Sequence, residues 1–248
     1  MKNLLLSALF LFLTTTTYIH PQDSLQATIE WYGHSSFLMT TSQGAKITTD
    51  PVNKWYPRQP HQADVVTVSH NHGDHNAVQI VWNNPRILYG KTREEIDPEQ
   101  KFLKIDETIK GVHIYDVESH HFKPEHSPSL NAIFVFEFDE LRICHMGDIG
   151  RVLTQEQLNE IGKIDILMIP VGGYYTVEIN EADDIIAQLN PKIVLPMHYR
   201  NDVVDFVPNT LDDFLKGKTN IKRLNSTELN ISKAVLPEKL TYMILDYK

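Results

Sequence analysis

The stretch SHNHGDHN at residues 69–76 gathers four side chains that can bind metal ions, namely His70, His72, Asp74 and His75. Neutral imidazole and carboxylate are preferred ligands of zinc-like cations. His70 and His72 are two residues apart, so in an extended backbone they project to the same side and can hold one ion. Gly73 permits a sharp turn, after which Asp74 and His75 face a second position nearby. The spacing therefore predicts one half of a site for two metal ions.

Two neighbouring ions would give the chain hydrolytic chemistry. Ions about 3.5–4 Å apart share a water molecule, lower its pKa and hold the attacking and leaving oxygens of a substrate. A metal-bound hydroxide would attack a small ester-like substrate (a lactone, a phosphoester or an amide), and Asp74 would orient this nucleophile or accept its proton. Histidine-rich ligation favours Zn²⁺, while Mn²⁺ and Fe²⁺ remain open.

Further candidate ligands stand where predicted strands end. The cluster follows the apolar strand 63–70, and three more predicted strands, 111–121, 141–148 and 191–199, end on or near His120 with His121, Asp148 and His198. Because loops at strand ends often carry functional residues, we expect these side chains to converge on the cluster. Taken singly, such a histidine is more often structural and Asp148 more often a turn residue. Their combination with the cluster indicates metal binding.

The elements that must position these residues change in kind along the chain. The first half is rich in predicted strands, including a hairpin whose arms, 28–41 and 45–50, are joined through Gly44. The second half adds predicted helices over 154–162, 180–189 and 209–217. Thr154 and Asn180 are the predicted N-caps of the first two. This pattern predicts a layered α/β protein with mixed sheets, helices outside and functional loops at strand ends.

Charge and the N-terminus set further limits. The formal net charge is −9, from 23 Lys and Arg against 32 Asp and Glu, and no dense basic block is present, so no nucleic-acid partner is expected. Residues 1–26 have the layout of a secretory signal peptide around the apolar run 4–13. We therefore expect an exported protein, periplasmic or secreted, with no stable membrane span after signal removal and one domain over 27–248. The single cysteine, Cys144, excludes an intramolecular disulfide. The cleavage point and the oligomeric state stay open.

The order H-x-H-x-D-H, distal His, Gly-Asp and final His resembles the metallo-β-lactamase superfamily, and it is written here in His70, His72, Asp74, His75, His121, Asp148 and His198. The surrounding motifs narrow the resemblance: WYGHSSF, TDP at 49–51, NAIF, ICHMGDIG, IDILMIPVGG and VLPMHY. They are similar to the branch of metal-dependent hydrolases related to L-ascorbate-6-phosphate lactonase. The match runs from about Ile29 to Tyr199, and its motifs specify the superfamily far better than a substrate.

This resemblance implies a four-layer αββα sandwich with two mixed β-sheets, helices outside and a binuclear site at one edge of the sheets. It implies a first ion on His70, His72 and His121, a second on Asp74, His75 and His198, and Asp148 bridging the two. His121 is favoured over its neighbour His120 because the family ligand stands second after the serine. An acidic residue commonly follows that ligand in the branch, whereas Phe122 follows here, which leaves the substrate open.

Four further residues allow two interpretations each. His34, in a predicted strand, either supports a metal ligand from behind or is structural. Asp50, before Pro51, either ends a strand as a turn residue or orients a histidine of the cluster. Tyr174 and Tyr175 follow two glycines; a tyrosine hydroxyl there would bind a developing oxyanion, or the segment is a plain loop.

Two other classes of protein compete with a small-molecule hydrolase. Diiron redox proteins share the implied fold but carry a glutamate where His72 stands, so His72 favours hydrolysis. A non-catalytic metal-binding protein is the second alternative. The complete ligand set argues against it, because such a set leaves a position for water that a closed structural site does not need.

Overall fold

The computed structural model describes residues 26–248, except 58, 93–96, 98–99 and 122–128. The predicted signal peptide thus lies outside the described residues apart from Gln26, and so does Phe122. Among the described residues, no helix combines the length and the apolar character needed to cross a membrane.

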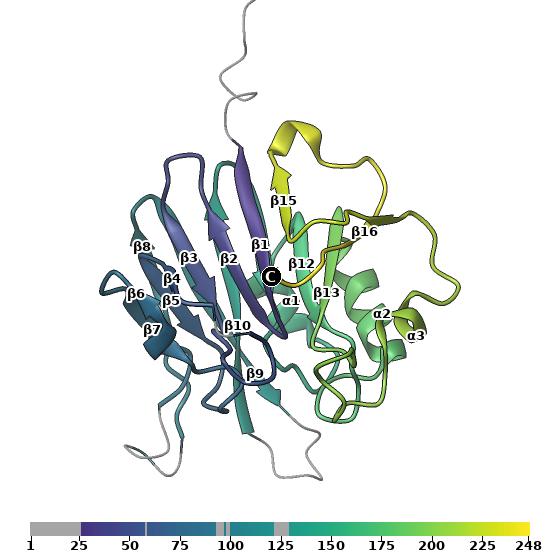
Figure 1. Ribbon diagram of the computed structural model, residues 1–248, viewed down its shortest axis with the longest axis horizontal. Coiled ribbons are helices and arrows are strands. Elements are labelled where there is room, and N and C mark those ends of the chain that lie inside the picture. The colour runs from purple at the N-terminus through teal and green to yellow at the C-terminus, as the bar shows by residue number, and fades with distance from the viewer. Residues whose placement is uncertain (1–25, 58, 93–96, 98–99, 122–128) are drawn as a thin grey trace, which may run out of the picture.

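Two mixed β-sheets share one apolar core (Figure 1). The first sheet has the order β15 (Glu228–Ile231), β1 (Ala27–Gly33), β2 (Ser36–Thr40), β3 (Lys46–Thr49), β5 (Val65–Val68) and β7 (Arg86–Tyr89). The second has the order β14 (Ile221–Arg223), β16 (Thr241–Ile244), β13 (Ile193–Met197), β12 (Ile166–Pro170), β11 (Leu141–His145), β10 (Ser129–Phe138), β9 (Val112–His121) and β8 (Asp106–Ile109). A separate pair joins β4 (His61–Gln62) to β6 (Val81–Trp82). The predicted α/β sandwich with mixed sheets is confirmed.

Strand direction explains why one edge of the sheets collects the polar residues. In the first sheet β1, β3 and β5 run the same way, because β2 is antiparallel to both of its neighbours and β3 is parallel to β5. In the second sheet β9, β11, β12 and β13 also share a direction. The carboxyl ends of co-directional strands meet at one edge, where ligands bind in open α/β sheets. Every candidate ligand of the sequence lies at or just after one of these ends.

The core between the sheets is built from strands that are apolar on both faces or that alternate between apolar and polar residues. β10 contributes Phe134 and Phe136, and β2 contributes Phe37; all three are at most 1% exposed. Strands covered on both sides read as continuous apolar runs, as in β12 and β13. This packing holds the strand ends, and therefore the loops that follow them, in fixed positions.

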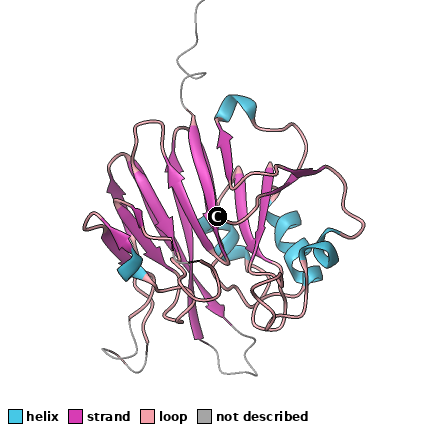
Figure 2. Ribbon diagram, in the orientation of Figure 1, coloured by secondary structure: helices cyan, strands magenta, loops and turns pink. Residues whose placement is uncertain are grey.

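Three α-helices are present among the described residues: α1 (Gln155–Ile161), α2 (Ile179–Leu189) and α3 (Leu211–Leu215). Figures 1 and 2 show α2 and α3 beside β12 and β13. The first sheet is covered instead by a short 3₁₀ helix, Val78–Ile80, and the β4–β6 pair, which bury a small apolar cluster against β5. The outer layer on this side is therefore thin.

The structure confirms some predicted element boundaries and corrects others. Thr154 caps α1, and its hydroxyl accepts a hydrogen bond from the backbone N–H of Gln157. The N-cap of α2 is Glu178, so the prediction of Asn180 was wrong by two residues. The predicted hairpin arm 28–41 is two strands, β1 and β2, which reverse at residues 33–36. His34 lies in this turn, with φ 51°, and not in a strand.

Candidate metal centre

The first group of possible ligands consists of His70, His72 and His121, whose ligand atoms lie within 4.8 Å of one another. His70 and His72 follow β5, and His121 ends β9 on the other sheet. Nε2 of His70 is 3.1 Å from Nδ1 of His72. His70 and His121 are buried, at 0% and 1% exposure. Two strand ends from different sheets thus place three imidazole nitrogens around one point.

The second group consists of His34, Asp74, His75 and His198, again with ligand atoms within 4.8 Å of one another. Nε2 of His34 lies 3.2 Å from Oδ2 of Asp74, and Nε2 of His75 lies 3.9 Å from the same oxygen. The rings of His34 and His198 approach to 4.0 Å between centroids. The structure therefore adds His34 to the three residues that the resemblance implied for a second ion.

Asp148 lies between the two groups. Its Oδ2 is 3.2 Å from Nε2 of His75 and of His198, and 3.7 Å from Nε2 of His70 and of His121. Its other oxygen, Oδ1, is buried and makes no hydrogen bond within the described part of the chain. A buried carboxylate oxygen without a partner is costly, and a bound cation would remove that cost. The residues therefore fit a pair of divalent ions with Asp148 between them.

A hydrogen-bond network fixes which nitrogen each histidine presents. Asp50 accepts the Ser69 backbone N–H at Oδ1 (2.7 Å) and the Ser69 hydroxyl at Oδ2 (2.6 Å). Because the Ser69 hydroxyl donates its hydrogen to Asp50, its oxygen can accept a hydrogen bond from Nδ1–H of His70 at 3.0 Å. Nδ1–H of His75 likewise donates to Asp50 at 2.9 Å. His70 is left with a bare Nε2 toward Asp148, and His75 turns its Nε2 to the same carboxylate, where a metal ion can bind once the proton leaves. Asp50 thus makes the hydrogen bond to a cluster histidine that the second of its two predicted roles requires.

The backbone at these strand ends is strained. His34, Asp50 and His198 have φ values of 51°, 35° and 51°, a region that non-glycine residues rarely adopt. Gly147, before Asp148, also has positive φ (55°), and a Cβ there would lie 2.3 Å from Oδ1 of Asn131. That amide oxygen accepts the backbone N–H of Asp148. Such strain persists where the surroundings fix it and is concentrated at functional sites.

Charge and burial set the protonation states. Burial lowers the pKa of His34 and of His121 to about 4, and it holds the pKa of His70 well below its usual value. Burial opposes ionisation of Asp148, but the neighbouring His198 and His75 outweigh it and keep its pKa well below the usual value. His75 differs: burial would lower its pKa, yet Asp148 and Asp50 raise it. Without a cation His75 keeps a proton, and a metal ion would replace that proton.

The metal centre opens into a cavity of about 410 Å³, which is called the metal cavity below. It is lined by Lys54, Trp55, His72, Asp74, His121, Asp148, Tyr175, His198, Asp205 and Phe206. Tyr175 therefore faces the cavity, whereas Tyr174 is 71% exposed and does not line it. Sequence reasoning missed Trp55, Asp205 and Phe206, since no local pattern marks them, and it missed Ser69, whose place before the cluster was the available signal.

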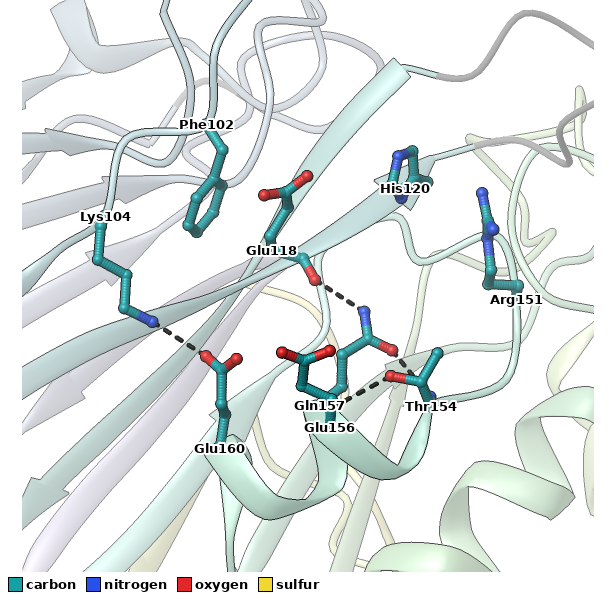
Figure 3. A pocket seen from close by; sticks show the side chains of 9 residues that line it. All are labelled: Phe102, Lys104, Glu118, His120, Arg151, Thr154, Glu156, Gln157 and Glu160. Atoms are coloured by element: carbon teal, nitrogen blue, oxygen red, sulfur yellow. Dashed lines mark hydrogen bonds and ion pairs between the residues drawn. The ribbon is translucent and has the colours of Figure 1, made fainter.

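His120 lies away from both ligand groups, in a different cavity (Figure 3). Successive side chains of a strand point to opposite faces, and β9 turns His121 inward and His120 outward. His120 shares its cavity with Arg151 and Glu118. His121 therefore lies beside Asp148, whereas His120 lies on the opposite face of the sheet.

Comparison with known proteins agrees with this geometry. A family profile described as "Beta-lactamase superfamily domain" matches residues 28–198. A UPF0173 metal-dependent hydrolase of Archaeoglobus fulgidus is 29% identical over 211 residues, which cover 76% of this chain and 89% of the relative. A crystal structure from Thermotoga maritima, described as a candidate Zn-dependent hydrolase of the metallo-β-lactamase superfamily, is 34% identical, with a TM-score of 0.73, and covers 90% of this chain and 100% of that chain. CmlA, a diiron β-hydroxylase from Streptomyces venezuelae, has a similar fold at 15% identity, with a TM-score of 0.52 over 69% of this chain and 44% of that chain.

Proposed function

This chain belongs to the metallo-β-lactamase superfamily as a metal-dependent hydrolase, and from that premise we propose that it holds two divalent ions and cleaves small ester-like substrates. The observation that carries the proposal is the position of Asp148. One carboxylate oxygen lies within 3.7 Å of four histidine nitrogens that belong to two separate ligand groups. Zn²⁺ suits these imidazole and carboxylate ligands, with Mn²⁺ and Fe²⁺ as alternatives.

We propose that His70, His72 and His121 hold one ion, that Asp74, His75 and His198 hold the other, and that Asp148 contacts both. When bound, such ions lower the pKa of a water molecule and polarise the substrate oxygen that is attacked. Asp50 and Ser69 keep the histidines in the tautomers that ligation requires. The substrate enters from the metal cavity, which His72, Asp74 and His198 help to line.

Asp74 is the residue proposed to handle the proton of the attacking water. Burial alone would raise the pKa of its carboxyl group, but the hydrogen bond from His34 and the nearby His75 lower the pKa below its usual value. Asp74 is therefore ionised at neutral pH. Its Oδ2 accepts Nε2–H of His34, which leaves Oδ1 to accept a hydrogen bond from water in the cavity. A fixed carboxylate within reach of the nucleophile can orient it and take its proton.

Metal content and a substrate screen test this proposal. The full chain, after supplementation with zinc or manganese, should contain about two divalent ions by elemental analysis. It should hydrolyse at least one of p-nitrophenyl acetate, a γ-lactone, bis(p-nitrophenyl) phosphate and a chromogenic β-lactam, and chelation should abolish this activity. Trace metal, or full occupancy without hydrolysis of any of them, would overturn the proposal. Reductant-dependent oxygen consumption by iron-loaded protein would support the redox alternative instead.

We also propose that the protein is exported. The support is the apolar run 4–13 behind Lys2. Intact-mass analysis of protein recovered from its native host should show that this run has been removed. A mature chain that still begins at or near Met1 would exclude signal cleavage.

A further inference from the structure

Three aromatic side chains form one wall of the metal cavity: Trp55, Phe206 and Tyr175. The rings of Trp55 and Phe206 are 4.6 Å apart between centroids, with planes 34° apart, and Tyr175 meets Phe206 edge-on at 5.9 Å. Phe206 also lies 6.2 Å from the ring of His198, and Trp55 lies 5.7 Å from the ring of His34. The wall therefore begins beside the second ligand group and extends toward solvent, where Trp55 is 36% exposed.

The loops that carry the wall pack against each other. Val52 and Tyr56, on either side of Trp55, pack in an apolar cluster with Val204 and Val207, on either side of Phe206. Asn201 joins the two loops, because its Nδ2 donates to the Tyr56 hydroxyl at 2.9 Å and its Oδ1 accepts two backbone N–H groups of its own loop. A preformed surface loses little conformational entropy when a ligand binds.

Tyr175 and Trp55 are each held by the backbone around them. The segment before Tyr175 is tied to two elements, since the Glu178 side chain accepts the N–H of Tyr174 and the carbonyl of Gly172 accepts the N–H of Asn209. Trp55 has φ 67°, a conformation that is unfavourable for a bulky residue. Strain of this kind at the mouth of a cavity indicates that the position of the ring matters to function.

The side chains around the wall offer few partners to a phosphate group. Among the described residues that line the metal cavity, Lys54 is the one Lys or Arg, and its Nζ lies 4.4 Å above the Trp55 ring. Asp205, beside Phe206, adds a negative charge to the same rim. Phosphate sites usually combine several cationic or backbone donors, often with arginine in a bidentate arrangement. A planar apolar group matches this wall better, because aromatic rings stack on it in offset or edge-on contacts.

We propose that the wall binds an aromatic ring carried by the substrate next to its cleavable carbonyl, so that aryl or arylacyl esters and lactones are preferred over phosphorylated ones. This specificity rests on the proposed hydrolase function, since the ions would hold the carbonyl while the wall holds the ring. Burying an aromatic ring against such a wall should strengthen binding about tenfold or more.

Equilibrium binding tests the wall without requiring turnover. Zinc-loaded full-length protein is titrated calorimetrically with phenylacetate, acetate and glycerol 3-phosphate. The two carboxylates share an anchoring group and differ by the ring, so phenylacetate should bind at least about tenfold more tightly than acetate and more tightly than glycerol 3-phosphate. Equal affinity for the two carboxylates, or preference for the phosphate, would overturn the proposal whatever the variants do.

Matched variants locate the effect. Trp55→Ala and Phe206→Ala should remove most of the advantage of phenylacetate, and Trp55→Leu, which keeps an apolar side chain, should remove part of it. Val235→Ala and Trp82→Ala are the controls, because both side chains are exposed and neither lines the metal cavity. Metal content should stay the same in all five. If phenylacetate still binds more tightly than acetate in both Trp55→Ala and Phe206→Ala, its ring binds elsewhere and the proposal is wrong.

Hydrolysis then separates the two proposals. With benzyl acetate and ethyl acetate, whose leaving groups are similarly basic, or phenylacetate and acetate esters of one alcohol, the wall predicts a higher kcat/KM for the aromatic member of each pair. Ring-dependent binding without hydrolysis of any ester would refute the proposed function and leave the wall standing. Hydrolysis with equal kcat/KM within each pair would refute the wall and leave the function standing.

Discussion

Two cavities lie on opposite faces of β9, and they use charged residues in opposite ways. The metal cavity contains Asp148, which is 2% exposed and surrounded by imidazoles. The cavity behind the sheet, about 520 Å³, is lined by Phe102, Lys104, Glu118, His120, Arg151, Thr154, Glu156, Gln157 and Glu160 (Figure 3). There Lys104 pairs with Glu160 at 3.1 Å, and both side chains are more than 40% exposed.

This difference shows which polar clusters indicate a ligand. Exposed ion pairs contribute little to stability, because water screens both partners. Burying charged side chains costs free energy unless new interactions compensate for their lost hydration. In the metal cavity Asp148 keeps a buried oxygen without a hydrogen bond. The residues there are better explained by their capacity to bind a cation than by their own contribution to folding. Four predictions test this contrast, beginning with the largest effect.

The neighbours His120 and His121 offer the most direct test. His121→Ala removes an imidazole that lies 3.7 Å from Asp148, so the metal content should fall from about two ions to about one and hydrolysis should fall by about a hundredfold or more. His120→Ala, the matched control behind the sheet, should change neither quantity appreciably. Elemental analysis and initial rates measure both. If His120→Ala has the larger effect on metal content and hydrolysis, our assignment of His121 as the metal ligand is wrong.

Asp74→Asn separates catalysis from folding within the metal cavity. The substitution keeps the size and one acceptor oxygen but removes the charge, so kcat should fall on the order of a hundredfold or more. The melting temperature should change little, because Asp74 lines the cavity and is not part of the apolar core. His198→Ala is the comparison: it should weaken the second ion, and excess metal should partly restore the rate. Hydrolysis by Asp74→Asn at the parental rate would refute the proposed mechanism.

His34→Phe should have a smaller effect, about tenfold in kcat. Phe fills the same space but removes the Nε2–H that donates to Asp74 at 3.2 Å. Burial raises the pKa of Asp74, and the hydrogen bond from His34 is the leading effect that lowers it. Without this donor the pKa of Asp74 rises, so the acidic limb of the kcat–pH profile should move to higher pH. A purely structural His34 would leave that limb in place.

The sequence could predict the ligands because they are chemically distinctive and follow strand ends. It could also predict the fold, since apolar strands and capped helices are local patterns. Trp55 and Phe206 could not be found this way: they are about 150 residues apart in the chain, and apolar residues in loops look alike until packing brings them together. His34 was placed in a strand because the turn at residues 33–36 interrupts an apolar run without a proline or a longer polar segment. Asn180 is the stronger N-cap by residue type, whereas the observed cap, Glu178, forms a capping box in which its backbone N–H donates to the Glu181 side chain at 2.9 Å.

A last prediction compares two buried carboxyl groups, Asp148 among the histidines and Asp116 in the middle of β9. Asp116 is 0% exposed; its Oδ1 accepts the backbone N–H of Ile105 at 2.8 Å, and its Oδ2 makes no hydrogen bond within the described residues. Burial raises its pKa to about 7, above an unfolded value of about 4. The folded protein therefore holds a proton there that the unfolded chain releases.

The sign of the effect follows from proton linkage. Between about pH 4 and pH 7 the folded state binds more protons at Asp116 than the unfolded state, so this residue makes the free energy of unfolding fall as pH rises, with no further change above the folded pKa. Asp116→Asn is neutral at every pH and keeps an acceptor for Ile105, so it should gain stability relative to the parent across this range, by a few kcal/mol at most. Urea unfolding of metal-free protein from pH 4.5 to pH 8.5 measures the difference. Glu107→Gln, at a partly exposed acid on the adjacent β8, is the control and should run parallel to the parent. If the curve of Asp116→Asn is also parallel to that of the parent, Asp116 is ionised in the folded state. Burial alone would then not protonate a carboxyl group on β9, even one without the neighbouring histidines that keep Asp148 ionised.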